Sequence, residues 1–292
     1  MSMDRRSLLK GLAAAATVSA VSAPAVVEAK PRAVRADARG LLYDATKCVG
    51  CKACVVGCKS ESNLQPDPKS FGGGLYDASD GLTEYTKTIV QLYREGDEYS
   101  FVKKQCMHCV DPGCVSACML GALTKGEFGI VSWQADRCVG CRYCQIACPF
   151  EVPQFEWSKA NPRIVKCDLC QDRVKDGKEP VCAEICPRGA IQYGTREELL
   201  KEAHARIAAQ PDVYVNRVYG ETELGGTQVL YLSGVEFDKL GFRFDQSAAV
   251  PAIQQSAQRQ VYAPLALLAL VGGLTFRQRR KDAQRNDEAE KK

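Results

Sequence analysis

The sequence predicts an α+β fold in which a small cysteine-rich unit occurs twice, followed by an apolar C-terminal helix. Three observations carry this prediction. All sixteen cysteines fall into four similarly spaced runs of four between residues 48 and 186. The second and fourth runs are followed by matching tails, Gly121-Ala122-Leu123 and Gly189-Ala190-Ile191, which indicates internal duplication of a two-run unit. Residues 261–276 contain no charged side chain.

The third run determines how the others are interpreted. Cys138, Cys141, Cys144 and Cys148 are followed by Pro149, and C-x2-C-x2-C-x3-C-P is the spacing by which bacterial ferredoxins hold iron–sulfur clusters. The fourth cysteine of such a run binds the neighbouring cluster. One run therefore implies a second.

The first run repeats this spacing, whereas the second has four residues and the fourth has eleven between the second and third cysteines. These three runs are Cys48, Cys51, Cys54 and Cys58; Cys106, Cys109, Cys114 and Cys118; and Cys167, Cys170, Cys182 and Cys186. Lys59 and Met119 replace the usual proline after the first and second runs. Four complete runs leave no cysteine over, which predicts four [4Fe–4S] clusters in two ferredoxin-like dicluster modules. Spacing alone does not say which runs pair.

Zinc and disulfide bonds are the alternative uses of these cysteines. C-x2-C pairs also build zinc sites, but zinc gives no reason for the x2-C-x3-C-P continuation. Disulfides are disfavoured because cysteines so close on a tight loop are poorly placed to pair with each other. A chain of 292 residues can also bury a core without such bonds.

Residues 1–29 are predicted to be a twin-arginine signal peptide. Arg5 and Arg6 precede the apolar stretch Gly11 to Val27, which ends near an A-x-A-like cleavage site at residues 27–29. An ordinary secretory signal with a basic start is the alternative. The twin-arginine route is favoured because it carries folded proteins, and iron–sulfur clusters are inserted before export.

Local patterns predict several short elements. The capping box Thr195 to Glu198 predicts a helix that ends before Pro211, within a C-terminal extension over residues 195–258. The glycines at residues 72–74 lack the rest of a phosphate-binding pattern and are expected in a loop. Strands are expected at residues 88–93, 130–131 and 191–193, and within 225–232.

Charge and histidine content exclude two classes of function. The formal net charge is +4, but residues 30–276 carry no net charge, so a basic nucleic-acid surface is not expected. No catalytic residues are predicted, since no Ser/His/Asp set stands out and His108 and His204 are the only histidines. His108 lies in a run that already has four cysteines. We expect it on the surface, with a hydrogen bond that tunes the cluster as the alternative.

Residues 261–276 are predicted to be a transmembrane helix, with a buried core helix as the alternative. Sixteen residues span about 24 Å as a helix against a hydrocarbon core of about 30 Å, so the length is marginal. Arg277, Arg279, Arg280 and Lys281 follow at once. The positive-inside rule therefore places residues 277–292 as a basic cytoplasmic tail and the body at the periplasmic face of the membrane.

Four stretches together resemble a known family, namely residues 42–51, 103–112, 138–144 and 225–230. They are similar to the four-cluster iron–sulfur subunit of periplasmic, membrane-associated [NiFe] hydrogenases, the HybA type, and the resemblance runs from the signal to the C-terminal segment. The cysteine pattern is shared more widely, with beta subunits of formate dehydrogenases and other molybdopterin oxidoreductases. In those enzymes the partner usually carries the export signal, so they are the second choice.

The resemblance implies how the runs pair. Within residues 40–194, runs one and four form one dicluster module, and runs two and three form a second module, about residues 100–155, inserted in it. Four ligand sets follow: set A is Cys48, Cys51, Cys54 and Cys186; set B is Cys58, Cys167, Cys170 and Cys182; set C is Cys106, Cys109, Cys114 and Cys148; set D is Cys118, Cys138, Cys141 and Cys144. Some relatives lack one cysteine of the third run and hold a three-iron cluster. The presence of Cys141 favours four cubanes.

The resemblance also implies a function. The chain would relay electrons between the small and large subunits of a hydrogenase, or another periplasmic oxidoreductase, and a polytopic quinone-reactive membrane subunit. It would have no substrate site of its own, and no cysteine is left to hold nickel.

Overall fold

The computed structural model describes residues 33–68, 81–159, 162–242, 247–251, 268–281 and 283–284. The chain divides into two compact units, Pro31–Pro251 and a second unit made of Met1–Lys30 with Ala252–Lys292. The predicted signal peptide, including Arg5 and Arg6, and the predicted loop at residues 72–74 lie outside the described residues. The strands and cysteine-bearing helices all belong to the Pro31–Pro251 unit.

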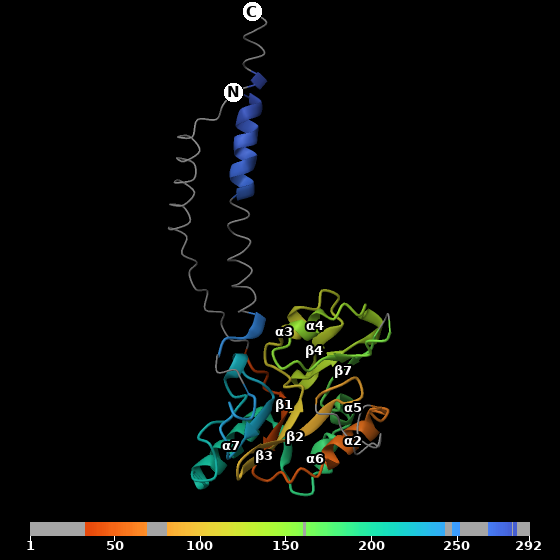
Figure 1. The fold of residues 1–292 in the computed structure, drawn as a ribbon, viewed down its shortest axis with the longest axis vertical. Coiled ribbons are helices and arrows are strands. Elements are labelled where there is room, and N and C mark those ends of the chain that lie inside the picture. Colours follow the sequence, from red (N-terminus) through yellow and green to blue (C-terminus); the bar gives the residue numbers. More distant parts are fainter. Residues whose placement is uncertain are drawn as a thin grey trace, which may run out of the picture. The chain divides into compact units, whose positions relative to one another are not determined.

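A three-stranded sheet forms the centre of this unit (Figure 1). Strand β1 (Arg39–Asp44) lies between β8 (Ile191–Thr195), which is antiparallel to it, and β9 (Val229–Leu232), which is parallel. All of β9, and β1 apart from Arg39, are buried. The two faces of the sheet are therefore both covered, and successive residues of a strand contact different neighbours.

Helix α7 (Arg196–Ala209) covers one face of the sheet. Leu42 and Leu230 pack there against Leu199, Ala203 and Ile207. The predicted capping box is confirmed: Glu198 N–H donates to Thr195 Oγ1 at 3.3 Å, and Thr195 N–H donates to Glu198 Oε2 at 3.1 Å. These bonds satisfy two amides at the start of the helix that have no partner within the helix.

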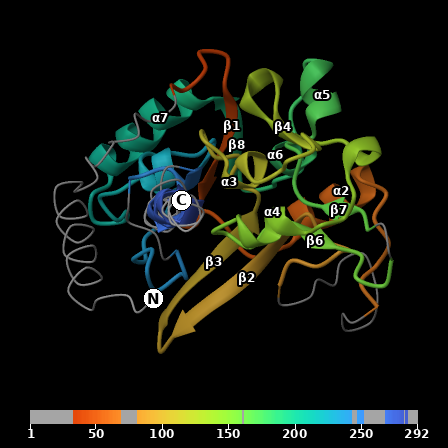
Figure 2. The ribbon, with the colours of Figure 1, turned by 90° about the horizontal axis from the view of Figure 1, so that it is seen from above.

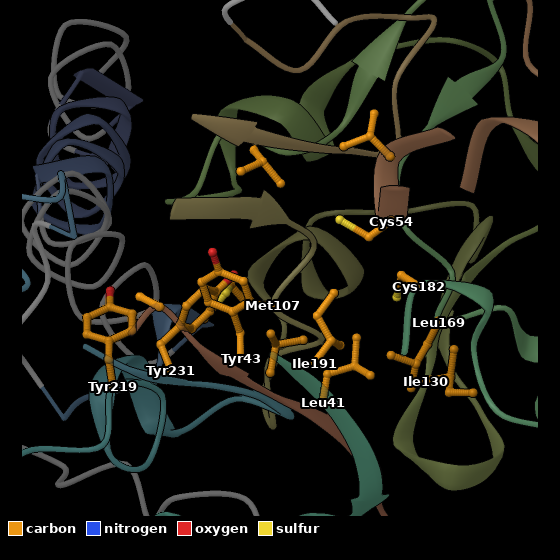
Figure 3. Packing of buried hydrophobic residues seen from close by; sticks show 14 of the residues in the cluster. Leu41, Tyr43, Cys54, Met107, Ile130, Leu169, Cys182, Ile191, Tyr219 and Tyr231 are labelled. Atoms are coloured by element: carbon orange, nitrogen blue, oxygen red, sulfur yellow. The ribbon is translucent and has the colours of Figure 1, made fainter. Parts of the chain in front are cut away.

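The other face of the sheet contacts the cysteine-bearing elements. Leu41, Tyr43 and Ile191 belong to one buried cluster with Cys54 and Cys182 (Figure 3). Because adjacent residues on β1 point to opposite faces, Leu41 and Tyr43 support the cysteine region while Leu42 supports α7.

Five short helices carry or flank the cysteine runs: α2 (Ala53–Glu61), α3 (Gly113–Ser116), α4 (Tyr143–Ile146), α5 (Gln171–Lys175) and α6 (Val181–Glu184). Helix α2 packs against α6, and α3 packs against α4 (Figure 1). The first run thus meets the fourth, and the second run meets the third.

Three antiparallel hairpins and three 3-10 turns complete the unit. The hairpins pair β2 (Thr88–Glu95) with β3 (Glu98–Gln105), β4 (Leu123–Lys125) with β5 (Val131–Trp133), and β6 (Gln154–Phe155) with β7 (Ile164–Val165). The turns are η1 (Glu127–Gly129), η2 (Ala135–Arg137) and η3 (Glu223–Gly225). The β2–β3 hairpin is the most extended of the three (Figure 2). All four strand predictions are confirmed, in β2, β5, β8 and β9, and the fold mixes helices with mainly antiparallel strands as expected.

The predicted transmembrane helix is not found. Within the part of the chain that the structure describes, no helix is both long and apolar enough to cross a membrane. Residues 268–281 are helical and exposed, but only residues 268–276 of this helix precede Arg277, and residues 261–267 of the predicted segment lie outside the described residues.

Candidate cluster sites

Each cysteine run places its third cysteine at the same point of a helix. Cys54, Cys114, Cys144 and Cys182 are each the second residue of their helix, and all four are buried. The first-turn amides of a helix have no partner within it and favour a thiolate over a thiol nearby. The four runs therefore present this ligand in the same way.

The loops before these helices share a backbone turn. The second residue after the first cysteine has a positive φ in every run, and from the first run to the fourth these residues are Gly50 (70°), His108 (47°), Gly140 (69°) and Leu169 (55°). The turn directs amides to sulfur, since Gly50 N–H donates to Cys48 Sγ and Leu169 N–H to Cys167 Sγ, both at 3.4 Å. Such bonds stabilise negatively charged, metal-bound sulfur.

The structure brings the cysteines of each implied set together. Those of set A line one pocket. Burial and then the proximity of Cys182, a set B residue, raise the pKa of Cys58 to about 12, and Cys167 has Cys58 beside it. In set C, burial and then Cys148, Cys106 and Cys114 raise the pKa of Cys109. In set D, burial raises the pKa of Cys144 to about 12, with the other three set D thiols among its neighbours.

The four sets also follow one another in space. Cys54 of set A lies beside Cys182 of set B, Cys167 of set B beside Cys106 of set C, and Cys114 of set C beside Cys144 of set D. The order is therefore A, B, C, D. Cys141, in the terminal set D, is the one exposed cysteine of the sixteen, all of which lie in described segments.

The chemistry of the cysteines fits iron–sulfur clusters. None of the sixteen, all within the described segments, is in a disulfide. They occur in groups of four soft sulfur ligands, and two of the loops donate N–H groups to sulfur. Among the described residues, no three His, Cys, Asp or Glu side chains form a site for a single metal ion.

Besides Lys59, which follows Cys58 and is buried, two further lysines next to the cysteines, Lys103 and Lys166, are buried, and this was not predicted. Lys103 Nζ donates to Thr88 Oγ1 on the facing strand β2 and to Gln105 Oε1 on its own strand β3. Burial lowers the pKa of Lys103, but nearby thiols of sets A and B outweigh that effect, and its net pKa is raised. Lys166 Nζ donates to the carbonyls of Val131 and Cys167. Both ammonium groups can offset negative charge on the sulfurs.

The surface position expected for His108 is wrong. The side chain is fully buried, and its Nδ1 accepts a hydrogen bond from Val131 N–H on β5 at 3.0 Å. Burial first, and then Lys166 and Lys125, lower the pKa of His108 well below its ordinary value. The histidine is therefore neutral, and its side chain lies in the protein interior beside the cysteines of the second run. Its buried position depends on β5, which follows well after the histidine in the chain, so the local pattern could not reveal it.

Replacing Lys103 by methionine is expected to lower the reduction potentials of the clusters in sets A and B. Two unit charges interact by about 1–2 kcal/mol over roughly 8–16 Å at an effective dielectric constant of about 20. This is on the order of 40–90 mV, because about 1.4 kcal/mol corresponds to about 59 mV in a one-electron couple. A potentiometric titration followed by EPR measures the shift. Lys104→Met is the matched control because Lys104 is the exposed neighbour on the same strand. Equal potentials in the two variants would contradict the assignment.

Comparison with known proteins supports the cluster interpretation. Residues 97–196 match the family model described as a 4Fe-4S dicluster domain. The chain is 36% identical to the Hydrogenase-2 operon protein HybA of Escherichia coli O157:H7 and of Shigella flexneri, over 95% of this chain and 95% of each relative. It is 40% identical to the nitrate-inducible formate dehydrogenase iron-sulfur subunit of Escherichia coli K12, over 65% of this chain and 66% of that relative.

Proposed function

Because this chain belongs to the HybA family of iron–sulfur proteins, we propose that it is an electron-transfer subunit of a hydrogenase complex. In this proposal the chain carries electrons through four [4Fe–4S] clusters, from a hydrogen-oxidising catalytic subunit to a quinone-reactive membrane subunit. The observation that carries the proposal is the row of four thiol sets in one compact unit, with set A at one end and set D at the other.

The backbone orients the cysteine ligands, and the buried Lys103 offsets their negative charge. A bound [4Fe–4S] cluster supplies one-electron transfer. The helix starts orient the third cysteine of each run, and the left-handed loop residues direct amides to sulfur. Lys103 places a positive charge among the thiols of sets A and B. Five of the eight cysteines of the middle sets B and C are buried, which limits the access of water to the interior of the row, while exposed Cys141 leaves the set D end accessible to a partner.

An iron–sulfur subunit of formate dehydrogenase is the second candidate. The identity to the Escherichia coli K12 formate dehydrogenase subunit is 40%, slightly above the 36% to HybA. However, that similarity covers 65% of this chain, whereas the HybA similarity covers 95%. The extent of the match, rather than the identity within the cysteine region that both families share, favours the hydrogenase assignment.

Anaerobic purification with the associated subunits tests this choice. We expect hydrogenase subunits to copurify, and we expect hydrogen, but not formate, to bleach the iron–sulfur absorption near about 400 nm, where thiolate-bound clusters absorb. The comparison uses the same preparation with each donor, and dithionite defines full reduction. Reduction by formate alone, with a molybdopterin subunit in the preparation, would support the second candidate instead.

We further propose export by the twin-arginine route and action at the periplasmic face of the membrane. Residues 1–32 lie outside the described part of the chain, so this proposal is supported by the sequence of the signal alone. Membrane association through residues 261–276 also stays a prediction from the sequence, because residues 261–267 lie outside the described part of the chain.

Replacing both Arg5 and Arg6 by lysine is expected to leave most of the precursor in the cytosol. The receptor of the twin-arginine export route recognises the paired guanidinium groups. Lysine would preserve the positive charge but not these groups. Cell fractionation with an antibody to the chain measures the distribution. Lys10→Arg is the control because it keeps the charge and leaves the arginine pair intact. Normal export of the double lysine variant would show that the signal is a general secretory one.

A further inference from the structure

We propose that the imidazole of His108 donates a hydrogen bond from Nε2 to the cluster held by set C, and that this bond raises the reduction potential of that cluster above the value the cysteines alone would give. The inference deepens the proposed function and rests on it, since it requires a cluster at set C. It makes His108 a positioning residue that tunes the cluster without being a ligand.

The backbone determines which nitrogen of His108 carries the proton. Val131 N–H donates to Nδ1 at 3.0 Å, so Nδ1 must be unprotonated. A neutral imidazole then has its proton on Nε2. Val131 is itself held by β4 and by Lys166, which donates to its carbonyl. The ring is therefore fixed in one tautomer with Nε2–H as a donor.

That donor has no partner among the described residues. Nε2 of His108 is buried and makes no hydrogen bond with any group in the described part of the protein. A buried, unsatisfied N–H costs about 1–3 kcal/mol, so an acceptor absent from the protein chain itself is expected. His108 adjoins Cys109 and lies two residues from Cys106, both of set C, and an inorganic sulfide of the bound cluster is the acceptor that we place there.

The equivalent positions in the other runs show that the turn itself does not require histidine. Gly50, Gly140 and Leu169 occupy the same left-handed position in runs one, three and four. Glycine adopts this conformation without strain, and the leucine shows that an apolar side chain also fits. Histidine at this position adds a side-chain donor that the other three loops lack. The effect should therefore be confined to one cluster of the four.

Isotopic labelling tests the contact directly in the unaltered protein. The chain has two histidines, and His204 is exposed and pairs with Glu221 at 3.1 Å. After labelling with ¹⁵N-histidine, we expect a ¹⁵N hyperfine coupling in the pulsed EPR spectrum of one reduced cluster. His204→Gln should keep this coupling, and His108→Leu should abolish it. Four clusters without any ¹⁵N coupling would overturn the proposal.

Redox titration tests the consequence for the potential. In His108→Leu, which copies the residue that run four has at this position, the equilibrium constant for reduction of one cluster should fall about tenfold, which is about 59 mV for one electron. The other three potentials and the iron content should not change. His108→Gly, which copies runs one and three, repeats the test if the leucine variant does not fold. Unchanged potentials with all clusters present refute this inference alone, whereas absence of clusters from the unaltered protein refutes the proposed function.

Discussion

Protein purified without oxygen is expected to contain about sixteen iron atoms and about sixteen acid-labile sulfides per chain, at four of each per cubane. The reason is stoichiometric, since sixteen thiols are grouped in four sets and none is in a disulfide. Iron and sulfide analysis on one preparation measures both numbers. A broad absorption at about 380–420 nm from thiolate-to-iron charge transfer should accompany them.

Analysis of the bound metal and of labile sulfide distinguishes iron–sulfur clusters from the zinc alternative. Zinc bound by sixteen thiolates would give about four ions per chain, since structural zinc takes four ligands, and no visible absorption. Stoichiometric zinc without labile sulfide would therefore remove the basis of the electron-transfer function. Protein purified from cells that were grown with excess zinc serves as the control. Adventitious zinc should not displace iron from sites that already contain labile sulfide.

The elements that the sequence predicted well are those determined by neighbouring residues. The capping box at Thr195 needs only Glu198, three residues away, and both reciprocal bonds are present. The strands in β2, β5, β8 and β9 follow from short apolar patterns. Runs one and three are local in the same sense, because their first three cysteines lie within seven residues of chain, whereas helix α5 separates Cys170 from Cys182 in run four.

What the sequence did not reveal depends on contacts between distant segments. Strand β1 is the middle of the sheet, yet its partners β8 and β9 begin about 150 and 190 residues later, and nothing local marks it as central. Lys103 looks like an ordinary surface residue beside Lys104, and only the pairing of β3 with β2 and the nearby thiols bury it. His108 is buried for the same kind of reason, by its bond to Val131.

The pairing of the cysteine runs was predicted from the family resemblance and not from local spacing. Spacing left it open, and the resemblance implied that run one joins run four. Helix α2 of run one packs against α6 of run four, and α3 of run two packs against α4 of run three, while the assignment of the cysteines to shared clusters stays a prediction. Its consequence is that the two ends of a single run serve different clusters, which substitution can test.

Replacing Cys58 by serine should remove the set B cluster and spare the set A cluster, although Cys58 follows Cys54 in the same helix α2. Cys58 lies beside Cys182 and Cys170, and a serine hydroxyl is a poor substitute for a soft thiolate ligand. The variant should therefore retain about twelve iron atoms, at four per remaining cubane. Its EPR spectrum should lack the same signal as that of Cys170→Ser.

Cys54→Ser is the matched control, since it changes the same helix one turn earlier and should remove the set A signal instead. Both residues are buried to the same extent, at 8% exposure, so a general loss of packing would affect the two variants alike. Set B lies inside the row, between sets A and C. Hydrogen-dependent quinone reduction by the complex should therefore nearly disappear in Cys58→Ser, while hydrogen oxidation with an artificial acceptor at the catalytic subunit persists. If Cys58→Ser and Cys54→Ser lose the same EPR signal, one run serves one cluster, and the order A, B, C, D must be abandoned.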